Sequence, residues 1–268
     1  MSSLRFLLSR RWVLFALVVG LLAYLAWVLG QWQFDRLEER QDRNALIERN
    51  EQAPPVPPGE LMPVGDDVAA SDEWRTVTAT GTYAVEDTVI VRYRTRDGAA
   101  GVEVVVPLVT ADGTALLVDR GWLPTDNRGT ADPDDVPAPP QGEVTVTGWV
   151  RVDATGDSSS VTDQSTRAIS SDAIGEALDR EVYGGFVELR EESPAPAEPL
   201  APAELPELDS GPHFFYGLQW WFFGLLALVG FGYLAWDEWR KRPGRGSRPG
   251  ATTGDGVASG VGGSVPRR

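Results

Sequence analysis

Two long apolar stretches frame the chain, and the polar sequence between them alternates as β-strands do. Residues 12–30 contain 19 consecutive residues without a charge, and residues 210–236 contain 27. About 20 helical residues are enough to cross a hydrocarbon layer roughly 30 Å thick. The pattern therefore predicts two transmembrane helices, at about 12–32 and 212–238.

A cleaved signal peptide is the alternative for the first apolar stretch. Such signals have an apolar run of about 7–15 residues followed by small residues at the cleavage site. Here the run is longer, and Gln31-Trp32-Gln33 follows it. We therefore favour a helix that remains in the protein.

The first helix is predicted to continue beyond its apolar part. Residues 34–50 contain no glycine or proline, and Arg36 and Glu39 form an opposite-charge pair at helical spacing. The proline-rich Ala53–Pro58 that follows cannot continue a helix. We expect one helix that starts in the membrane and ends before this segment.

The middle of the chain predicts a β-rich domain. Six segments have the alternation and β-branched composition of strands, and Asp112-Gly113 marks a hairpin turn between two of them. We expect an antiparallel sheet, curled into a partial barrel. The six segments are Thr76–Tyr83, Thr88–Thr95, Val102–Val109, Thr114–Arg120, Glu143–Val152 and Phe186–Arg190.

A short helix is predicted near the end of this domain, over Ser170–Arg180. Ser170 or Ser171 provides the N-cap, and Ile174, Ala177 and Leu178 form the expected buried face. The fold class is therefore α+β, with two transmembrane helices flanking a β-rich domain.

Charge predicts the orientation in the membrane. Residues 1–11 carry a net charge of +3 and residues 237–268 a net charge of +4, whereas residues 31–211 have 14 arginines against 36 acidic residues. Because basic segments remain inside, we expect both termini in the cytoplasm and the domain at 33–211 outside. The tail at 239–268, rich in glycine and serine, is predicted to be disordered.

Composition excludes several kinds of chemistry. The chain has no cysteine and a single histidine, so thiolate metal sites, disulfides and multi-histidine metal centres are excluded. The formal net charge of −15 argues against a nucleic-acid partner. No hydrolytic triad or phosphate-binding glycine loop is recognisable, and we expect no enzyme activity.

The lone histidine, His213, lies at the outer end of the second apolar stretch. His213, Tyr216, Gly217 and Trp220 share one helix face, and a neutral imidazole is a good axial ligand for haem iron. A glycine there leaves room for a flat macrocycle. The alternative is that histidine and tyrosine anchor the interface while the glycine serves helix packing.

Two other groups of residues have similar alternatives. At the end of the first apolar stretch, Gly30 permits close approach of a second helix, and Arg36 could bind a carboxylate, a lipid headgroup or Glu39. Between the strands, Asp119-Arg120-Gly121-Trp122 predicts a structural corner, with Arg120 free to reach Asp119, Asp126 or a partner.

Taken together, these motifs resemble the Surfeit locus protein one (Shy-one type) family of cytochrome c oxidase assembly factors. The resemblance covers residues 12–236 and includes the exit from the first helix, two strands and their corner, and the entry to the second helix. Gly217 departs from it, since the family commonly has alanine there. The matching residues are Gly30, Trp32, Gln33, Arg36, Arg92, Gly101, Pro107, Leu108, Gly113, Val118, Arg120, Gly121, Trp122, Pro212, His213, Tyr216, Gln219 and Trp220.

The resemblance implies a function in the bacterial plasma membrane. Family members assist insertion of haem a into the catalytic subunit of haem–copper oxidase, or stabilise that subunit during assembly. The resemblance implies that His213 ligates haem iron, with Tyr216, Gln219, Trp32 and Arg36 shaping the site. It implies the oxidase catalytic subunit as partner, with haem a synthase and membrane lipid as further candidates.

Two alternatives to haem handling remain open. The first is a membrane scaffold that binds oxidase subunits and never contacts haem. The second is an unrelated two-helix sensor, which the absence of a folded output domain in the tail disfavours.

Overall fold

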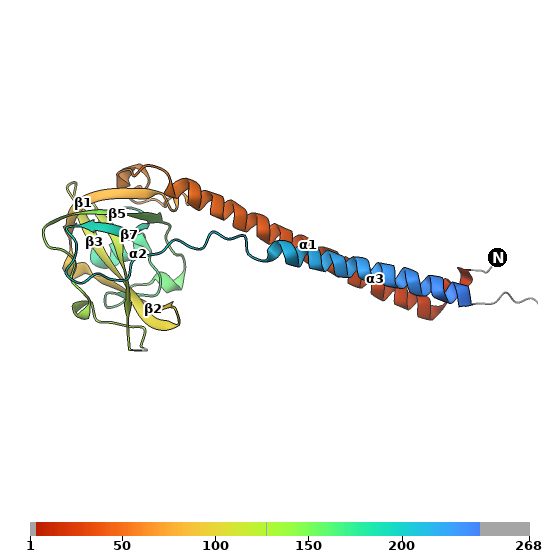
Figure 1. Cartoon of the computed structure of the whole chain (residues 1–268). Helices are drawn as coiled ribbons and strands as arrows, with labels where there is room; N and C mark the ends of the chain where they lie inside the picture. The colour runs from red at the N-terminus through yellow and green to blue at the C-terminus, as the bar shows by residue number, and fades with distance from the viewer. Residues whose placement is uncertain (1–3, 127, 242–268) are drawn as a thin grey trace, which may run out of the picture. The chain divides into compact units, whose positions relative to one another are not determined.

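The chain forms two compact units, which the computed structural model describes over residues 4–126 and 128–241. One unit consists of Met1–Phe34 and Phe214–Arg268, and the other of Asp35–His213 (Figure 1). We refer to the described part of the first unit as the helix pair and to the second unit as the barrel domain. The predicted tail at 239–268 lies outside the described residues from 242 onward.

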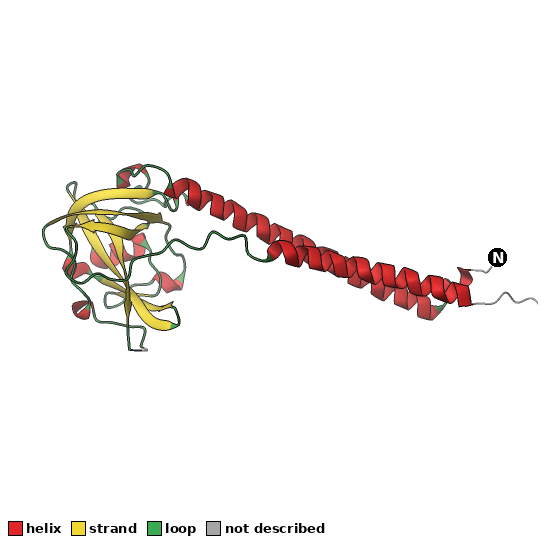
Figure 2. Cartoon of the chain, viewed as in Figure 1, coloured by secondary structure: helices red, strands yellow, loops and turns green. Residues whose placement is uncertain are grey.

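The described residues contain three α-helices: α1 at Arg10–Glu51, α2 at Ser171–Leu178 and α3 at His213–Lys241 (Figure 2). The helix α1 is unbroken, which confirms that the apolar stretch and its charged continuation form one helix. It ends directly before the proline-rich segment, because proline cannot donate the next backbone hydrogen bond. Short 3₁₀ helices lie at Leu4–Leu8, Pro58–Glu60, Ala70–Asp72, Val85–Asp87, Pro133–Asp135 and Asp157–Ser159.

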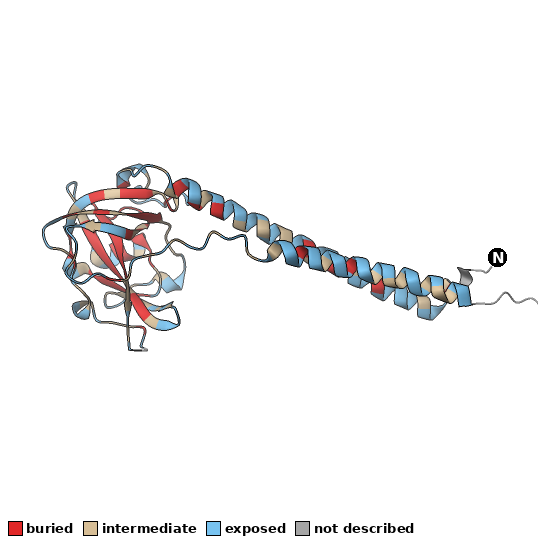
Figure 3. Ribbon diagram, in the orientation of Figure 1, coloured by how far each residue is buried: buried red, intermediate tan, exposed pale blue. Residues whose placement is uncertain are grey.

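The helix pair packs α1 and α3 through aromatic and small side chains. The ring of Phe231 lies 5.8 Å from that of Trp12 and 5.4 Å from that of Phe15. Further along, Gly224 approaches Ala26 closely. Most of the remaining apolar side chains of both helices are exposed (Figure 3). Both helices are long and apolar enough to cross a membrane, and their exposed apolar surface is compatible with a lipid environment.

Seven strands form the sheet of the barrel domain. The six predicted segments are all strands, and a seventh strand, β6, was not among the predicted ones. The strands are β1 at Thr76–Tyr83, β2 at Val89–Arg96, β3 at Ala99–Thr110, β4 at Ala115–Pro124, β5 at Glu143–Arg151, β6 at Ser165–Thr166 and β7 at Phe186–Ser193.

The sheet closes on itself, so the barrel is complete where a partial one was expected. Its order is β1-β5-β7-β4-β3-β2-β6, and β1 also pairs with β3. Two of the pairings, β4 with β7 and β2 with β6, are parallel, so the expectation of a purely antiparallel sheet was wrong. The reason is that each parallel pair joins strands far apart in the chain, and long connections let a strand return in the same direction.

The strand β3 has apolar residues on both faces because each face packs against a different hydrophobic cluster. Val104 and Val106 belong to the main cluster with Leu116 and Val118 of β4, whereas Val105 belongs to a second cluster with Ile174 of α2. A strand covered on both sides is apolar at successive positions rather than at alternate ones. Burying each such side chain contributes about 1.5–3 kcal/mol to folding.

In α2, the predicted N-cap at Ser170 is confirmed, but the predicted burial of Ala177 is wrong. Ser170 is the N-cap and accepts a hydrogen bond from the backbone N–H of Ala173. Ile174 is buried and Leu178 partly buried, but Ala177 is exposed. Gly175 occupies the buried position instead, because a side chain there would press on Val182.

Candidate functional site

The five predicted site residues divide between the two units. Trp32, Tyr216 and Gln219 belong to the helix pair, whereas Arg36 and His213 belong to the barrel domain. Trp32 is 48% exposed and Tyr216 46% exposed. Trp32, Tyr216 and Gln219 thus present accessible surface on the helix pair.

In the helix pair, two glycines and two aromatic residues form a reciprocal contact. The indole of Trp221 lies against Gly30, and the ring of Phe34 lies against Gly217, where an added Cβ atom would be 2.8 Å from it. The two rings are themselves in contact, with centroids 4.9 Å apart. The close approach expected at Gly30 is therefore present. The space expected beside Gly217 for a macrocycle is filled by Phe34, so this glycine serves helix packing.

In the barrel domain, the segment leading to His213 is fastened to α1. The Nε atom of Arg40 donates to the backbone oxygen of Asp209 at 2.8 Å, and Asn44 Nδ2 donates to the same oxygen at 3.0 Å. Arg40 also forms an ion pair with the Asp209 carboxylate. Gly211, with φ of +62°, lies beside the imidazole of His213. The position of His213 at the start of α3 therefore depends on side chains of α1.

Sequence reasoning selected Arg36 on α1 and missed Arg40 and Asn44. Arg36 forms an ion pair with Glu39 at 2.7 Å, as its spacing predicted. The missed residues share one helix face with Ile47, which is buried against Trp74 and Trp149. That spacing of four and then three residues was a usable signal for a packed face.

His213 offers one imidazole as a possible metal ligand. Over residues 4–126 and 128–241, no three His, Cys, Asp or Glu side chains are grouped as a metal site would need. His213 is the only histidine in the chain. One imidazole can supply one axial ligand to a haem.

The predicted corner at Asp119–Trp122 lies inside β4, which continues to Pro124, and the register against β3 shifts there, so the segment is a bulge in the strand and not its end. The side chain of Arg120 is only 1% exposed and pairs with Glu192 at 2.9 Å, rather than with Asp119 or Asp126. The hydroxyl of Tyr83 donates to the same carboxylate at 2.9 Å. Burial and the negative charge of Glu192 raise the pKa of Tyr83, so the phenol stays protonated.

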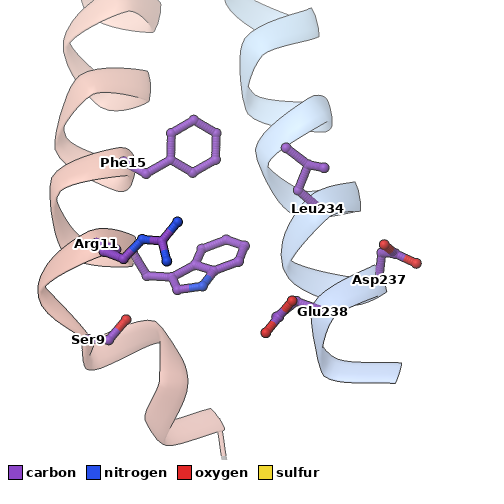
Figure 4. Close-up of a pocket in the computed structure, with 7 residues that line it drawn as sticks. Ser9, Arg11, Phe15, Leu234, Asp237 and Glu238 are labelled. Carbon is purple, nitrogen blue, oxygen red and sulfur yellow. The ribbon is translucent and has the colours of Figure 1, made fainter. Parts of the chain in front are cut away.

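At the other end of the helix pair, a pocket of about 450 Å³ lies between α1 and α3. Its lining combines the apolar side chains of Phe15 and Leu234 with charged side chains, among them Arg11, Asp237 and Glu238. Figure 4 shows the guanidinium of Arg11 and the carboxylate of Glu238 pointing into the gap between the two helices.

Comparison with known proteins agrees with the motifs. The sequence model of the SURF1 family matches residues 20–225. Uncharacterized SURF1-like proteins of Mycobacterium bovis and of two strains of Mycobacterium tuberculosis are each 34% identical to this chain over 248 residues, covering 90% of both sequences. The family match includes the whole barrel domain and residues 20–34 and 214–225 of the helix pair.

Proposed function

Because this chain belongs to the SURF1 family, we propose that it acts as an assembly factor for haem–copper cytochrome c oxidase. It assists insertion of haem a into the catalytic subunit, or stabilises that subunit during assembly. The family is linked to cytochrome c oxidase assembly and is not known as a catalytic one. The observation that carries the proposal is the family match over most of the chain.

The proposal places the protein in the bacterial plasma membrane, with α1 and α3 crossing it and both termini in the cytoplasm. The support is the length and apolar composition of the two helices, together with their exposed leucine, valine and phenylalanine side chains. The arginines at 1–11 and the basic tail support the orientation. The pocket at Arg11 and Glu238 would then contact lipid headgroups on the cytoplasmic side.

Haem a is the cargo in this proposal, with His213 as the ligand to its iron. Exposed Trp32 and Tyr216 offer aromatic faces for the macrocycle, Gln219 offers an amide, and the Arg36 guanidinium suits a propionate. These roles rest on residue chemistry and on the family's motifs. Because Phe34 occupies the space beside Gly217, the macrocycle is not expected to enter there.

The test is the absorption spectrum of the full-length protein purified from cells that make haem a. We expect a bound-haem band that is lost in His213→Ala and unchanged in Ser210→Ala, a nearby exposed control. An identical spectrum in His213→Ala, or no haem in the unaltered protein, would contradict the cargo role. Oxidase activity and haem content of membranes lacking the protein test the assembly role separately.

A scaffold that binds the oxidase catalytic subunit without contacting haem is the second candidate. The filled space beside Gly217 favours it, because the feature expected to admit a macrocycle is used for helix packing. Co-purification of the catalytic subunit, with normal oxidase assembly, in the His213→Ala variant would select this function over haem handling.

A further inference from the structure

A cleft of about 620 Å³ opens in the barrel domain and includes none of the residues assigned to haem. It is lined by the aromatic side chains of Trp74, Tyr93 and Trp122, by carboxylates that include Asp119, and by the proline-containing segment at residues 201–206. The segment is joined to the barrel by backbone hydrogen bonds between Trp122 and Ala201, with N···O distances of 2.8 and 3.0 Å. The cleft is therefore part of the folded domain.

The cleft is lined by four carboxylate side chains and three guanidiniums, namely Glu103, Asp119, Glu188 and Glu204 against Arg94, Arg96 and Arg151. Arg94 lies 2.8 Å from Glu103, and Arg151 lies 2.6 Å from Glu188 and 3.0 Å from Glu73. Both guanidiniums are thus already paired. Asp119 has no cation within ion-pair distance among the residues that the structure describes.

The Asp119 side chain is buried and hydrogen-bonded to the backbone. The residue is 5% exposed, and its Oδ1 atom accepts a hydrogen bond from the backbone N–H of Gly121 at 3.1 Å. Within the described part of the chain this is the one hydrogen bond that the carboxyl makes, and neither of its oxygens is a fully enclosed atom without a partner. A buried carboxylate is costly without a donor or a cation beside it. Burial raises the pKa of this carboxyl, and a positively charged donor beside it would favour its ionised form.

Two of the aromatic residues that line the cleft have strained backbones. The φ angles of Trp74 and Tyr93 are +69° and +62°, in the left-handed region that bulky residues rarely adopt. Such a conformation costs on the order of 1–3 kcal/mol and is concentrated at functional sites. Tyr93 is held by a 2.7 Å hydrogen bond from its N–H to the oxygen of Gly129, and its side chain remains 53% exposed. The domain thus maintains an accessible aromatic ring at the cleft.

These rings already attract guanidinium groups of the chain itself. The guanidinium carbon of Arg151 lies 3.9 Å from the ring centroid of Trp74, and that of Arg167 lies 5.1 Å from the ring of Tyr93. A planar guanidinium stacks on aromatic faces and pairs with a carboxylate through two parallel hydrogen bonds. Arginine is therefore the side chain that matches both the walls and the buried carboxylate.

We propose that this cleft binds an arginine side chain of a partner protein, with its guanidinium paired to Asp119 and stacked against Tyr93 or Trp122. The charge of the region favours a basic partner, since residues 31–211 carry 36 acidic residues against 14 arginines. The proposal goes beyond the assembly role and does not depend on haem.

The experiment is a calorimetric titration of the full-length protein in detergent with N-acetyl-arginine N-methylamide. The matched control ligand is the citrulline analogue, which has nearly the same shape but no charge. We expect saturable binding of the arginine compound and at least tenfold weaker binding of the citrulline compound. Asp119→Asn should weaken arginine binding at least tenfold, and Asp172→Asn, on the exposed face of α2, should leave it unchanged.

The pH dependence of binding distinguishes a direct contact of Asp119 with the ligand from a purely structural role of this residue. Glu103, Glu188 and Arg94 act on Asp119 electrostatically, and Arg96, Arg151 and Glu204 are the other charged residues that line the cleft. Burial, then Glu103 and Glu188, raise the pKa of Asp119, so its carboxyl must lose a proton when a cation binds. Affinity for the arginine compound should therefore rise with pH, and this rise should be absent in Asp119→Asn.

A second variant tests the site independently, in case Asp119→Asn disturbs folding. Tyr93→Asn removes the ring while keeping a residue that tolerates a positive φ angle, and it should weaken binding several-fold. Absence of saturable binding, equal binding of the citrulline compound, or full binding by Asp119→Asn would overturn the proposal. Equal binding of the lysine analogue would overturn the choice of arginine. Tighter binding of free L-arginine would overturn a protein partner in favour of a small molecule.

Discussion

The ring of Phe34 on α1 lies against Gly217 on α3, so a side chain at position 217 would have to displace it. Four residues from each, Gly30 and Trp221 repeat the arrangement with the roles of the helices exchanged. Each helix thus supplies one glycine and one aromatic ring. Apolar helices associate through close packing of this kind, because lipid offers them no hydrophobic gain from contact.

We predict that Gly217→Leu weakens the helix pair by about 1–3 kcal/mol, the usual cost of overpacking. The control is Gly232→Leu on the same helix, where an added Cβ atom meets nothing within 4 Å. Thermal unfolding of the detergent-solubilised protein, followed by tryptophan fluorescence, measures the difference. Phe34→Ala should partly rescue Gly217→Leu, and equal effects of the two glycine substitutions would contradict the packing account.

Because Arg120 and Glu192 form a buried ion pair, we predict a large loss of folding stability when one of the two is removed. Arg120→Met leaves the Glu192 carboxylate uncompensated, and breaking a buried pair in this way costs about 3–5 kcal/mol. Arg96→Met provides the comparison, because its partner Glu204 has a side chain that is 77% exposed, and surface pairs contribute only about 0–1 kcal/mol. Urea unfolding measures both. A loss below about 1 kcal/mol in Arg120→Met would show that the network contributes little.

The strands were predictable from sequence because the alternation of apolar residues and the residues at the turns both indicate the same elements. Glu143–Arg151 alternates along its length, and the Asp112-Gly113 turn lies where the chain needs a positive φ angle at glycine. The short β6 was not predictable, since Ser165 and Thr166 have no apolar pattern and depend on pairing with β2. Local pattern predicts an element but not its distant partner.

The same distinction applies to the candidate site. His213 was selected because a lone histidine at the start of an apolar helix is visible in the sequence. The pairing of Arg120 with Glu192 joins residues 72 positions apart, and no local spacing indicates it. The filling of the Gly217 contact by Phe34 depends on the register between two helices, which neither helix encodes alone.

We predict that the stability of the barrel domain falls as pH rises above the usual carboxyl range. The folded state raises the pKa of Asp119 from its usual value of 3.8, chiefly by burial, whereas the unfolded chain keeps that value. Between the two values the folded protein binds more protons than the unfolded one, so the free energy of unfolding decreases with rising pH.

The measurement for this prediction is urea unfolding of the full-length protein as a function of pH. Asp119→Asn retains an acceptor for the Gly121 N–H and should flatten the decrease, leaving the variant more stable than the unaltered protein at the upper end of the window. Glu188 and Asp153, whose pKa values are also raised by burial, add to the decrease, whereas Asp112, whose pKa is lowered by hydrogen bonds, opposes it. An unchanged slope in Asp119→Asn would show that other groups dominate.

Because Arg40 of α1 holds the segment at 209–213, substitutions at Arg40 or Asp209 should alter the position of His213, although neither residue is expected to contact haem. Arg40→Gln removes the ion pair to Asp209, and Asp209→Asn removes it from the other side. Under the proposed function, each variant should reduce bound haem a several-fold while His213 itself is intact. The double variant should be no worse than the more severe single variant, because both remove the same interaction.

Arg43→Gln is the matched control on the same helix, since Arg43 is exposed there. Hydrogen exchange at residues 209–213 separates positioning from misfolding, because it should accelerate in Arg40→Gln while the strands of the barrel remain protected. If exchange accelerates and haem content does not fall, His213 does not depend on this fastening. If neither changes, the Arg40–Asp209 contact contributes nothing measurable, as is common for exposed ion pairs.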